Sequence, residues 1–337
     1  MYLMRNRVLP SLLLAAVLII SCSKSEEEET KPSLEGNLWA DVPAYVKMGR
    51  DLTISCGGIK NAPADLKYGW VCGTLFEDTL WMDQMTISIP DTICTHILLI
   101  IAQAEGYYSS TMNKYLTAVD PSRDGSLKGL PQSHGFMVDS RDGQQYDTVH
   151  IGKLAWFAEN LNFKEKGAAY ADADDVGDIL GRLYSWNDAV GEPGGSGLGG
   201  GPQGVCPEGW SVPTNEDWED FAAALGVGDP SFQSNWSGIA GRLMPKATFN
   251  GDLMWEYMGT FEQTNDLDWN ALSAGFATKE YTQFTGLKVM GAWWSSTPYS
   301  SDEGQYKYIN YSVNTMPVAK SSKSDFAASV RCVKKLD

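Results

Sequence analysis

The pattern of apolar and polar residues predicts strands in the first half of the chain. Alternating or strongly apolar segments occur at residues 52–56, 68–72, 85–89, 94–102 and 114–119. Turn-forming residues separate these segments, which is the spacing expected of a β-sandwich. We therefore expect a small all-β domain at residues 37–119, in which 94–102 is a long buried strand.

A helical period appears only in the second half of the chain. Apolar residues follow the i, i+3, i+4, i+7 spacing at Trp218, Phe221, Ala222 and Leu225. Thr214 is typical of a helix N-cap, and Asp217 stands three residues later, where a capping box needs its acceptor. This pattern predicts one amphipathic helix that packs two aromatic side chains into a core.

The remaining pattern predicts a compact α+β domain at residues 136–337. Asp142-Gly143 lies between two alternating segments, which favours a short hairpin. Further strands are expected at 291–296, 306–313 and 327–333, whereas 227–270 is mixed and loop-like. A glycine- and proline-containing stretch at 120–135 separates the two domains as a linker.

The N-terminus has the pattern of a targeting signal at residues 1–21. Two arginines precede an unbroken apolar run at residues 12–20, which is too short to span a bilayer. The sequence Ile19-Ile20-Ser21-Cys22 resembles the lipobox of bacterial lipoproteins, in which Cys22 becomes the acylated N-terminus. An ordinary cleaved signal that ends near a cysteine is the alternative.

An acidic tether follows at residues 22–36. Its block of like charge cannot bury apolar surface. Serine followed by acids after the lipid cysteine also resembles the surface-export signal of Bacteroidetes-type lipoproteins. We expect a lipid anchor in the outer membrane and display at the cell surface. The formal net charge of −16 excludes attraction to nucleic acid through the overall field.

Short motifs recur in order between about residues 137 and 335. They include Trp156-Phe-Ala-Glu-Asn-Leu161, Gly181-Arg-Leu-Tyr-Ser-Trp186, Cys206-Pro-Glu-Gly-Trp210, Val212-Pro-Thr214, Gly291-Ala-Trp-Trp294 and Val330-Arg-Cys332. Together they resemble the Fibrobacter succinogenes major paralogous domain, a sequence pattern of bacterial surface proteins.

Two further resemblances concern the fold. Val212-Pro-Thr214 followed by Asp217-Trp-Glu219 is similar to a helix of formylglycine-generating and sulfatase-modifying proteins, which implies a C-type-lectin-like architecture. The strand order of the first domain resembles an immunoglobulin-like sandwich. The expected fold is therefore an N-terminal all-β immunoglobulin-like sandwich followed by an α+β C-type-lectin-like domain.

Six cysteines suit a secreted protein. Cys206 and Cys332 lie within the family motifs at opposite ends of the C-terminal domain, where a disulfide would close a long loop. If the sandwich order holds, Cys72 pairs with Cys94 and Cys56 stays free; a Cys56–Cys94 bridge is the alternative. No CxxC pair is present and the histidines are scattered, so we expect no metal and no cofactor.

Three tryptophans are candidate ligand contacts. Trp236, Trp255 and Trp269 lie in the loop-like segment, and exposed tryptophans stack on sugar rings or anchor protein partners. Burial under long loops is the alternative. Trp186-Asn-Asp188 matches a calcium-binding tripeptide of sugar-binding lectins, but Glu192-Pro193 follows it in reversed order, which disfavours that chemistry.

The sequence therefore predicts a surface lipoprotein that binds a glycan or a protein partner in adhesion or nutrient capture. It predicts no catalytic residues and no enzyme, because no acid–base or nucleophile set is recognisable. The alternatives are a structural subunit of a cell-surface assembly, which would show an apolar patch or an open strand edge, and an enzyme with an unrecognised site.

Overall fold

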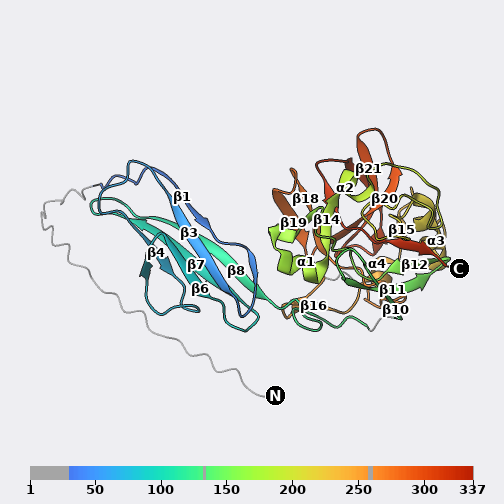
Figure 1. The fold of residues 1–337 in the computed structure, drawn as a ribbon, viewed down its shortest axis with the longest axis horizontal. Helices are drawn as coiled ribbons and strands as arrows, with labels where there is room; N and C mark the ends of the chain where they lie inside the picture. The colour runs from blue at the N-terminus through green and yellow to red at the C-terminus, as the bar shows by residue number, and fades with distance from the viewer. Residues whose placement is uncertain (1–29, 132–133, 257–260, 337) are drawn as a thin grey trace, which may run out of the picture.

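The computed structural model describes residues 30–131, 134–256 and 261–336 of the chain. The predicted signal peptide and Cys22 lie outside the described residues. Within the described ranges, no helix is long and apolar enough to cross a membrane. The structure is mostly β-sheet, with a sandwich followed by a larger body of strands and short helices (Figure 1).

The N-terminal sandwich consists of two sheets, of order β1-β3-β6 and β2-β8-β7-β4-β5. Their strands are β1 (Gly36–Asp41), β2 (Tyr45–Lys47), β3 (Asp51–Ile59), β4 (Lys67–Val71), β5 (Leu80–Trp81), β6 (Gln84–Ser88), β7 (Cys94–Gln103) and β8 (Ser110–Val119). All five predicted strands are confirmed. The short strands β2 and β5 and the first strand β1 were missed, because too few residues in them alternate to give a period.

The core of the sandwich is made by inward-facing residues of both sheets. Ile54 of β3, Trp70 of β4 and Leu98 of β7 are almost fully buried. The indole N–H of Trp70 donates to the Met82 carbonyl at 2.9 Å, so burial leaves no unpaired donor there. The expectation that β7 is a buried strand is wrong for the side chains on its outer face, because Ile97 is 56% exposed.

The C-terminal body is built on a four-stranded sheet, β10-β11-β12-β25, and an eight-stranded sheet along the path β13-β14-β24-β18-β20-β21-β23, with β19 beside β18. The strands of the first are β10 (Gly135–Val138), β11 (Gln145–Ile151), β12 (Leu154–Phe157) and β25 (Val333–Lys335). Those of the second are β13 (Ala168–Ala169), β14 (Arg182–Ser185), β18 (Ala274–Thr278), β19 (Gln283–Leu287), β20 (Met290–Pro298), β21 (Glu303–Asn310), β23 (Val318–Ser322) and β24 (Ala327–Ala328).

Small sheets and short helices fill the rest of this body. The sheets pair β15 (Trp236–Ser237) with β22 (Thr315–Met316), and β16 (Thr248–Phe249) with both β17 (Asp252–Leu253) and β9 (Leu127–Lys128). The helices are η1 (Tyr170–Asp172), α1 (Asp174–Leu180), α2 (Trp186–Val190), α3 (Asn215–Ala224) and α4 (Ala240–Leu243). The predicted hairpin is present, since β10 and β11 pair antiparallel with Val138 opposite Gln145.

The predicted helix is confirmed as α3, together with its cap. The Asp217 N–H donates to the Thr214 hydroxyl, and the Thr214 N–H donates to the Asp217 carboxylate at 2.8 Å. These reciprocal bonds satisfy two backbone donors that a helix start would otherwise leave open. The buried face carries Trp218 and Phe221, as the spacing predicts.

The segment predicted as a linker packs against the C-terminal body. Its strand β9 pairs with β16, and the Ser126 carbonyl accepts from the Asn250 N–H at 2.8 Å. The sandwich also touches this body directly, because the Lys47 N–H donates to the Asp175 carboxylate at 2.8 Å. Residues 121–131 thereby form one wall of a cavity described below.

The two halves of the molecule differ in their cysteines. The predicted Cys206–Cys332 disulfide is confirmed, with the Cα atoms 5.8 Å apart. The predicted Cys72–Cys94 disulfide is wrong in this structure, and so is its alternative with Cys56, because all three are free thiols.

Hydrogen bonding shows how the unpaired thiols are accommodated. The Cys94 thiol lies 3.2 Å from Nε2 of His96, and Nδ1 of that ring lies 2.7 Å from the Thr74 hydroxyl. That hydroxyl lies 3.3 Å from the Cys72 sulfur. The two thiols are therefore linked through the imidazole and the hydroxyl rather than bonded to each other.

Candidate functional site

The three tryptophans predicted as ligand contacts are buried. Trp236, Trp255 and Trp269 have no exposed surface, so the prediction that they meet a ligand on loops is wrong. The Trp236 indole donates to the Ser231 carbonyl at 3.0 Å, and the Trp255 indole donates to the Ala271 carbonyl at 3.1 Å. Both polar ends are thus satisfied inside the protein.

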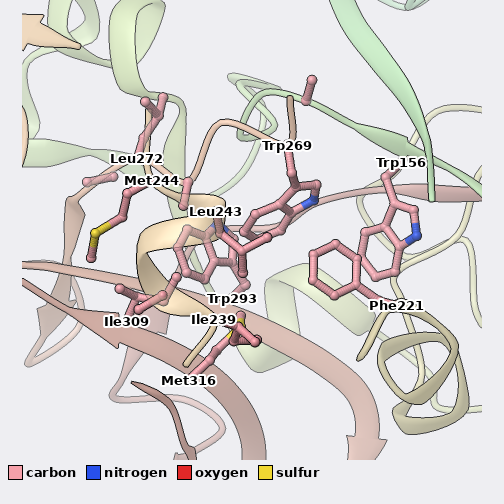
Figure 2. Packing of buried hydrophobic residues seen from close by; sticks show 14 of the residues in the cluster. Trp156, Phe221, Ile239, Leu243, Met244, Trp269, Leu272, Trp293, Ile309 and Met316 are labelled. Carbon is pink, nitrogen blue, oxygen red and sulfur yellow. The ribbon is translucent and has the colours of Figure 1, made fainter. Parts of the chain in front are cut away.

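The reason is that the loop-like segment closes the hydrophobic core. Figure 2 shows Trp269 between Trp293 and Phe221, with Trp156 beyond. The Trp269 ring centroid lies 4.9 Å from that of Trp293 and 5.1 Å from that of Phe221. Since residues 227–270 contain little regular structure, large aromatic side chains supply the packing that strands or helices would otherwise provide.

The tripeptide Trp186-Asn187-Asp188 is also part of the framework. The Trp186 indole is buried and donates to the Ser295 carbonyl at 2.9 Å. The Asp188 carboxylate accepts from the hydroxyl of Ser185 at 2.8 Å and from that of Tyr281. Both bonds end on Oδ2, so this carboxylate oxygen is engaged within the framework. In the part of the chain that the structure describes, no group of three or more His, Cys, Asp or Glu is placed to hold a metal ion.

A cavity of about 290 Å³ lies between the linker segment and the C-terminal body. We call it the linker pocket and define it by residues 121–124, 127, 130 and 131 of the linker segment, together with Asp147, Glu159, Asp178 and Asn270 of the C-terminal body. Gln144, Gln145, Ile179 and Leu272 complete it. The lining combines apolar side chains with convergent polar groups, and such polar groups are what orient a ligand in a small-molecule site.

Glu159 is the most unusual group in the linker pocket. It follows β12 within the Trp156-to-Leu161 motif, and its Oε1 accepts one long hydrogen bond from the Asp147 N–H at 3.3 Å. Burial raises the pKa of this carboxyl group, and the neighbouring Asp147 charge raises it further. Arg331 and Arg123 act in the opposite direction but do not cancel the effect of burial.

The other charged groups of the linker pocket differ in how far they are neutralised. Asp178 of α1 accepts from Nδ2 of Asn162 at 2.8 Å and pairs with the Lys164 ammonium at 2.9 Å. Arg123 and Asp124 lie on the exposed linker wall. The pocket therefore presents hydrogen-bond acceptors at its back and both signs of charge at its rim.

A second feature lies on the N-terminal sandwich. The outer face of the five-stranded sheet carries Trp81, Ile97, Leu99, Ile101 and Tyr115, which we call the apolar sheet face. Trp81, Ile97 and Tyr115 are 44%, 56% and 60% exposed. Ile97 lies directly opposite Tyr115 across β7 and β8, so the two side chains form one exposed pair.

The sequence of β7 contains a signal for the apolar sheet face. Residues 94–102 are almost continuously apolar, although a sheet with one solvated face should alternate. Such a run is typical of a strand covered on both sides, and the structure covers only one side. Glu159 gave no comparable signal, because one acidic residue in a hydrophobic motif does not reveal whether it faces solvent or a cavity.

Comparison with known proteins gives one match. The model of the Fibrobacter succinogenes major domain matches residues 149–334, which is more than half of the chain. The matched region contains α3, the disulfide, the buried tryptophans of the C-terminal body and Glu159. No curated protein and no solved structure matches the chain.

Proposed function

The chain belongs to the Fibrobacter succinogenes major domain family, and from this premise we propose that it is a lipid-anchored surface protein that binds a glycan without transforming it. The observation that carries the binding role is the linker pocket. Its amide and carboxylate groups suit the hydroxyl groups of a sugar, and Leu127, Ile179 and Leu272 suit the apolar faces of a ring.

The proposed location rests on the N-terminal sequence. The apolar run at 12–20 and the lipobox-like Ser21-Cys22 support export and acylation, and the acidic tether supports display outside the outer membrane. A single acyl chain binds a membrane only weakly, so a stable anchor needs more than one. Mass spectrometry of the N-terminal peptide from native membranes tests this: two or more acyl chains on Cys22 are expected, and an unmodified Cys22 contradicts it.

The non-catalytic role is supported by how the polar side chains of the motifs are used. The Ser295 hydroxyl donates to the Asn215 side-chain oxygen at 2.7 Å, and the Asp217 carboxylate is engaged in the cap of α3. Each contributes to the framework rather than to a nucleophile and base pair. Incubation of any bound glycan with the protein is expected to leave the glycan unchanged in mass and linkage.

The test of binding is a glycan array screened with residues 23–337, with and without calcium. The variant Arg123→Ala/Gln145→Ala removes two exposed polar side chains of the linker pocket. The matched control Lys279→Ala/Gln283→Ala removes a cation and an amide at exposed positions elsewhere. Binding is expected to fall at least tenfold in the first variant only. Equal binding by both variants, or no bound glycan at all, contradicts the proposal.

A second candidate function is a structural subunit of a surface assembly, and the apolar sheet face favours it. Large contiguous exposed apolar patches mark protein contacts, and aromatic residues are enriched at the cores of such interfaces. The aliphatic side chains between Trp81 and Tyr115 also separate the two rings, whereas a sugar platform needs stacked aromatic surfaces. A second copy of the chain is the partner that this candidate predicts.

For the finer fold we propose an immunoglobulin-like sandwich and a C-type-lectin-like C-terminal domain. The sandwich of three and five strands with the buried Trp70 supports the first. The pairing of the terminal β25 with β12, next to the Cys206–Cys332 bridge, supports the second. An experimental structure compared with known folds tests both assignments.

A further inference from the structure

We propose that the linker pocket selects ligands that carry a protonated amine, and that Glu159 is the group that pairs with this amine. The proposal rests on the proposed function in one respect, namely that the linker pocket is the ligand site. It goes further by naming the chemical group that is recognised and the residue that recognises it.

The first step is the incomplete bonding of the Glu159 carboxylate. Among the described residues, its only hydrogen bond is the 3.3 Å contact from the Asp147 N–H to Oε1, and Oε2 receives none. No ion pair of the described residues includes Glu159. A partly buried carboxylate is costly unless a cation or several donors compensate it. Glu159 lines the linker pocket, so a ligand bound there supplies that compensation.

The second step is that the buried cation Arg331, whose charge acts on Glu159, has its donors engaged elsewhere. The fully buried Arg331 donates to the Asn160 side-chain oxygen at 2.8 Å and to the Trp269 carbonyl at 2.7 Å. It also donates to the carbonyls of Phe157 and Asn270 at 3.1 and 2.6 Å. Its charge acts on Glu159 only through space, so the guanidinium does not close the pocket with an ion pair.

The third step is the charge of the whole cavity. Carboxylates line it at Asp124, Asp147, Glu159 and Asp178, whereas the lining contains one cation, Arg123. Lys164 pairs with Asp178 and so offsets one of these charges. An anionic ligand would meet repulsion from this wall, and a neutral sugar would offer only dipoles. An alkylammonium group offers a charge and three donors, which form the strongest class of hydrogen bond to carboxylate.

The fourth step concerns size and the competing cation. A cavity of about 290 Å³ is near the lower end of small-molecule sites, so it suits a monosaccharide or one amino-acid side chain. The carboxylates of the described residues are not placed as a metal-binding group. An amine on an amino sugar and an amine on a lysine side chain share the same chemistry, and the experiment separates these two sources.

The experiment is isothermal titration of residues 23–337 at pH 7 with glucosamine, glucose and N-acetylglucosamine, and with Nα-acetyl-lysine amide. Glucosamine or the lysine derivative is expected to bind at least tenfold more tightly than glucose and N-acetylglucosamine. Preference between the two amines identifies the source. Glu159→Gln, which keeps the shape of the side chain, is expected to lose at least tenfold in affinity for the amine and little for glucose. The control Glu280→Gln removes the same charge at an exposed position outside the linker pocket and is expected to change affinity less than threefold.

Equal affinity of the wild-type protein for glucose and glucosamine would overturn the inference while leaving the pocket as a sugar site. Unchanged amine binding by Glu159→Gln would also overturn it. If none of the four probes binds, the inference fails for these ligands, and the glycan array above decides separately whether the proposed function also fails.

A stability measurement confirms that Glu159→Gln folds and reports on the same carboxylate. Since the folded-state pKa of Glu159 is raised, its ionised form destabilises the fold above that pKa, and this penalty disappears as the pH falls through it. The variant is therefore expected to melt at a higher temperature than the wild type at pH 7. This difference should vanish at acidic pH. A variant that melts lower at pH 7 would contradict an uncompensated carboxylate.

Discussion

The two halves of the molecule use tryptophan in opposite ways. All nine tryptophans of the C-terminal body are buried, and eight of them are completely inaccessible or nearly so within the two core clusters around Trp269 and Trp294. In the sandwich, only Trp70 is buried, whereas Trp39 and Trp81 are 49% and 44% exposed.

Glycine explains how the sandwich holds exposed indoles in place. A Cβ added at Gly69 would lie 2.9 Å from the Trp81 ring, and one at Gly57 would lie 3.0 Å from the Trp39 ring. Each indole thus rests on a strand that has no side chain beneath it, with its other side open to solvent. An aromatic residue in a loop-rich segment can therefore belong to the core, whereas one on a regular strand can lie on the surface.

The largest expected loss of stability comes from removing the disulfide of the C-terminal body. Cys206→Ala/Cys332→Ala is expected to destabilise the C-terminal body by about 4–5 kcal/mol, because the bridge closes a loop with a sequence separation of 126 residues. Calorimetry should show its transition shifted to lower temperature, while that of the sandwich stays in place. Addition of a reductant to the wild-type protein should likewise lower the transition temperature of the C-terminal body and leave that of the sandwich unchanged.

Cys72→Ala is the matched control for the disulfide, since this thiol is buried but unbridged. It is expected to affect only the transition of the sandwich and to leave the reductant effect intact. A sandwich that also melts earlier with reductant would show that a bridge forms there in solution.

The second effect concerns Trp269 as a core residue. Trp269→Ala is expected to cost about 3–5 kcal/mol, the usual range for removing a fully buried large aromatic side chain. Trp39→Ala, at a half-exposed indole, is expected to cost about 1 kcal/mol or less. Urea unfolding followed by circular dichroism measures both. Similar losses in the two variants would erase the distinction between framework and surface tryptophans.

Local patterns predicted the elements well where the period was long. The five main strands of the sandwich and helix α3 follow directly from alternation and from the Thr214 cap. The prediction that the tryptophans of residues 227–270 are exposed failed. Irregular backbone has no period, so the sequence gives no sign of which way its side chains point. The motif tryptophans and the loop tryptophans share one core, and only tertiary packing shows this.

The candidate site was harder to predict for a related reason. Its groups come from the linker segment, from β11, from the end of β12 and from α1, which are distant in sequence. Glu159 lies in a motif, but its incomplete bonding depends on Arg331 donating to the carbonyls of Phe157, Trp269 and Asn270, which lie 174, 62 and 61 residues from Arg331 in the sequence. No local pattern contains that information.

The third effect concerns Lys307, whose ammonium group lies over the ring of the buried Trp236. Lys307 is fully buried, donates to the Ser234 carbonyl at 2.7 Å and lies 3.7 Å from the Trp236 ring. Burial lowers its pKa to about 7. Because the unfolded state keeps the proton up to a much higher pH, this group makes stability rise between about pH 7 and 10.

Lys307→Met is therefore expected to remove this rise, which amounts to about 1 kcal/mol per pH unit. Denaturant unfolding at several pH values between 7 and 9.5 measures it. Lys320→Met is the control, because Lys320 also lies over a ring, that of Tyr299, but is exposed and paired with Glu303. A slope that persists in Lys307→Met would mean that the rise comes from other groups.

The smallest effect on stability is expected for the exposed aromatic side chains of the apolar sheet face, which also bear on function. Trp81→Ser/Tyr115→Ser replaces two exposed rings of the apolar sheet face and is expected to cost less than about 1 kcal/mol. If this face joins two copies of the chain, sedimentation velocity should show a mass that rises with concentration for the wild type and a monomer for the variant. Identical monomeric behaviour of both would remove the structural-subunit candidate in this form and leave the linker pocket as the remaining basis for function. Because the variant keeps its stability, a change in association would then reflect the surface itself and not a loosened fold.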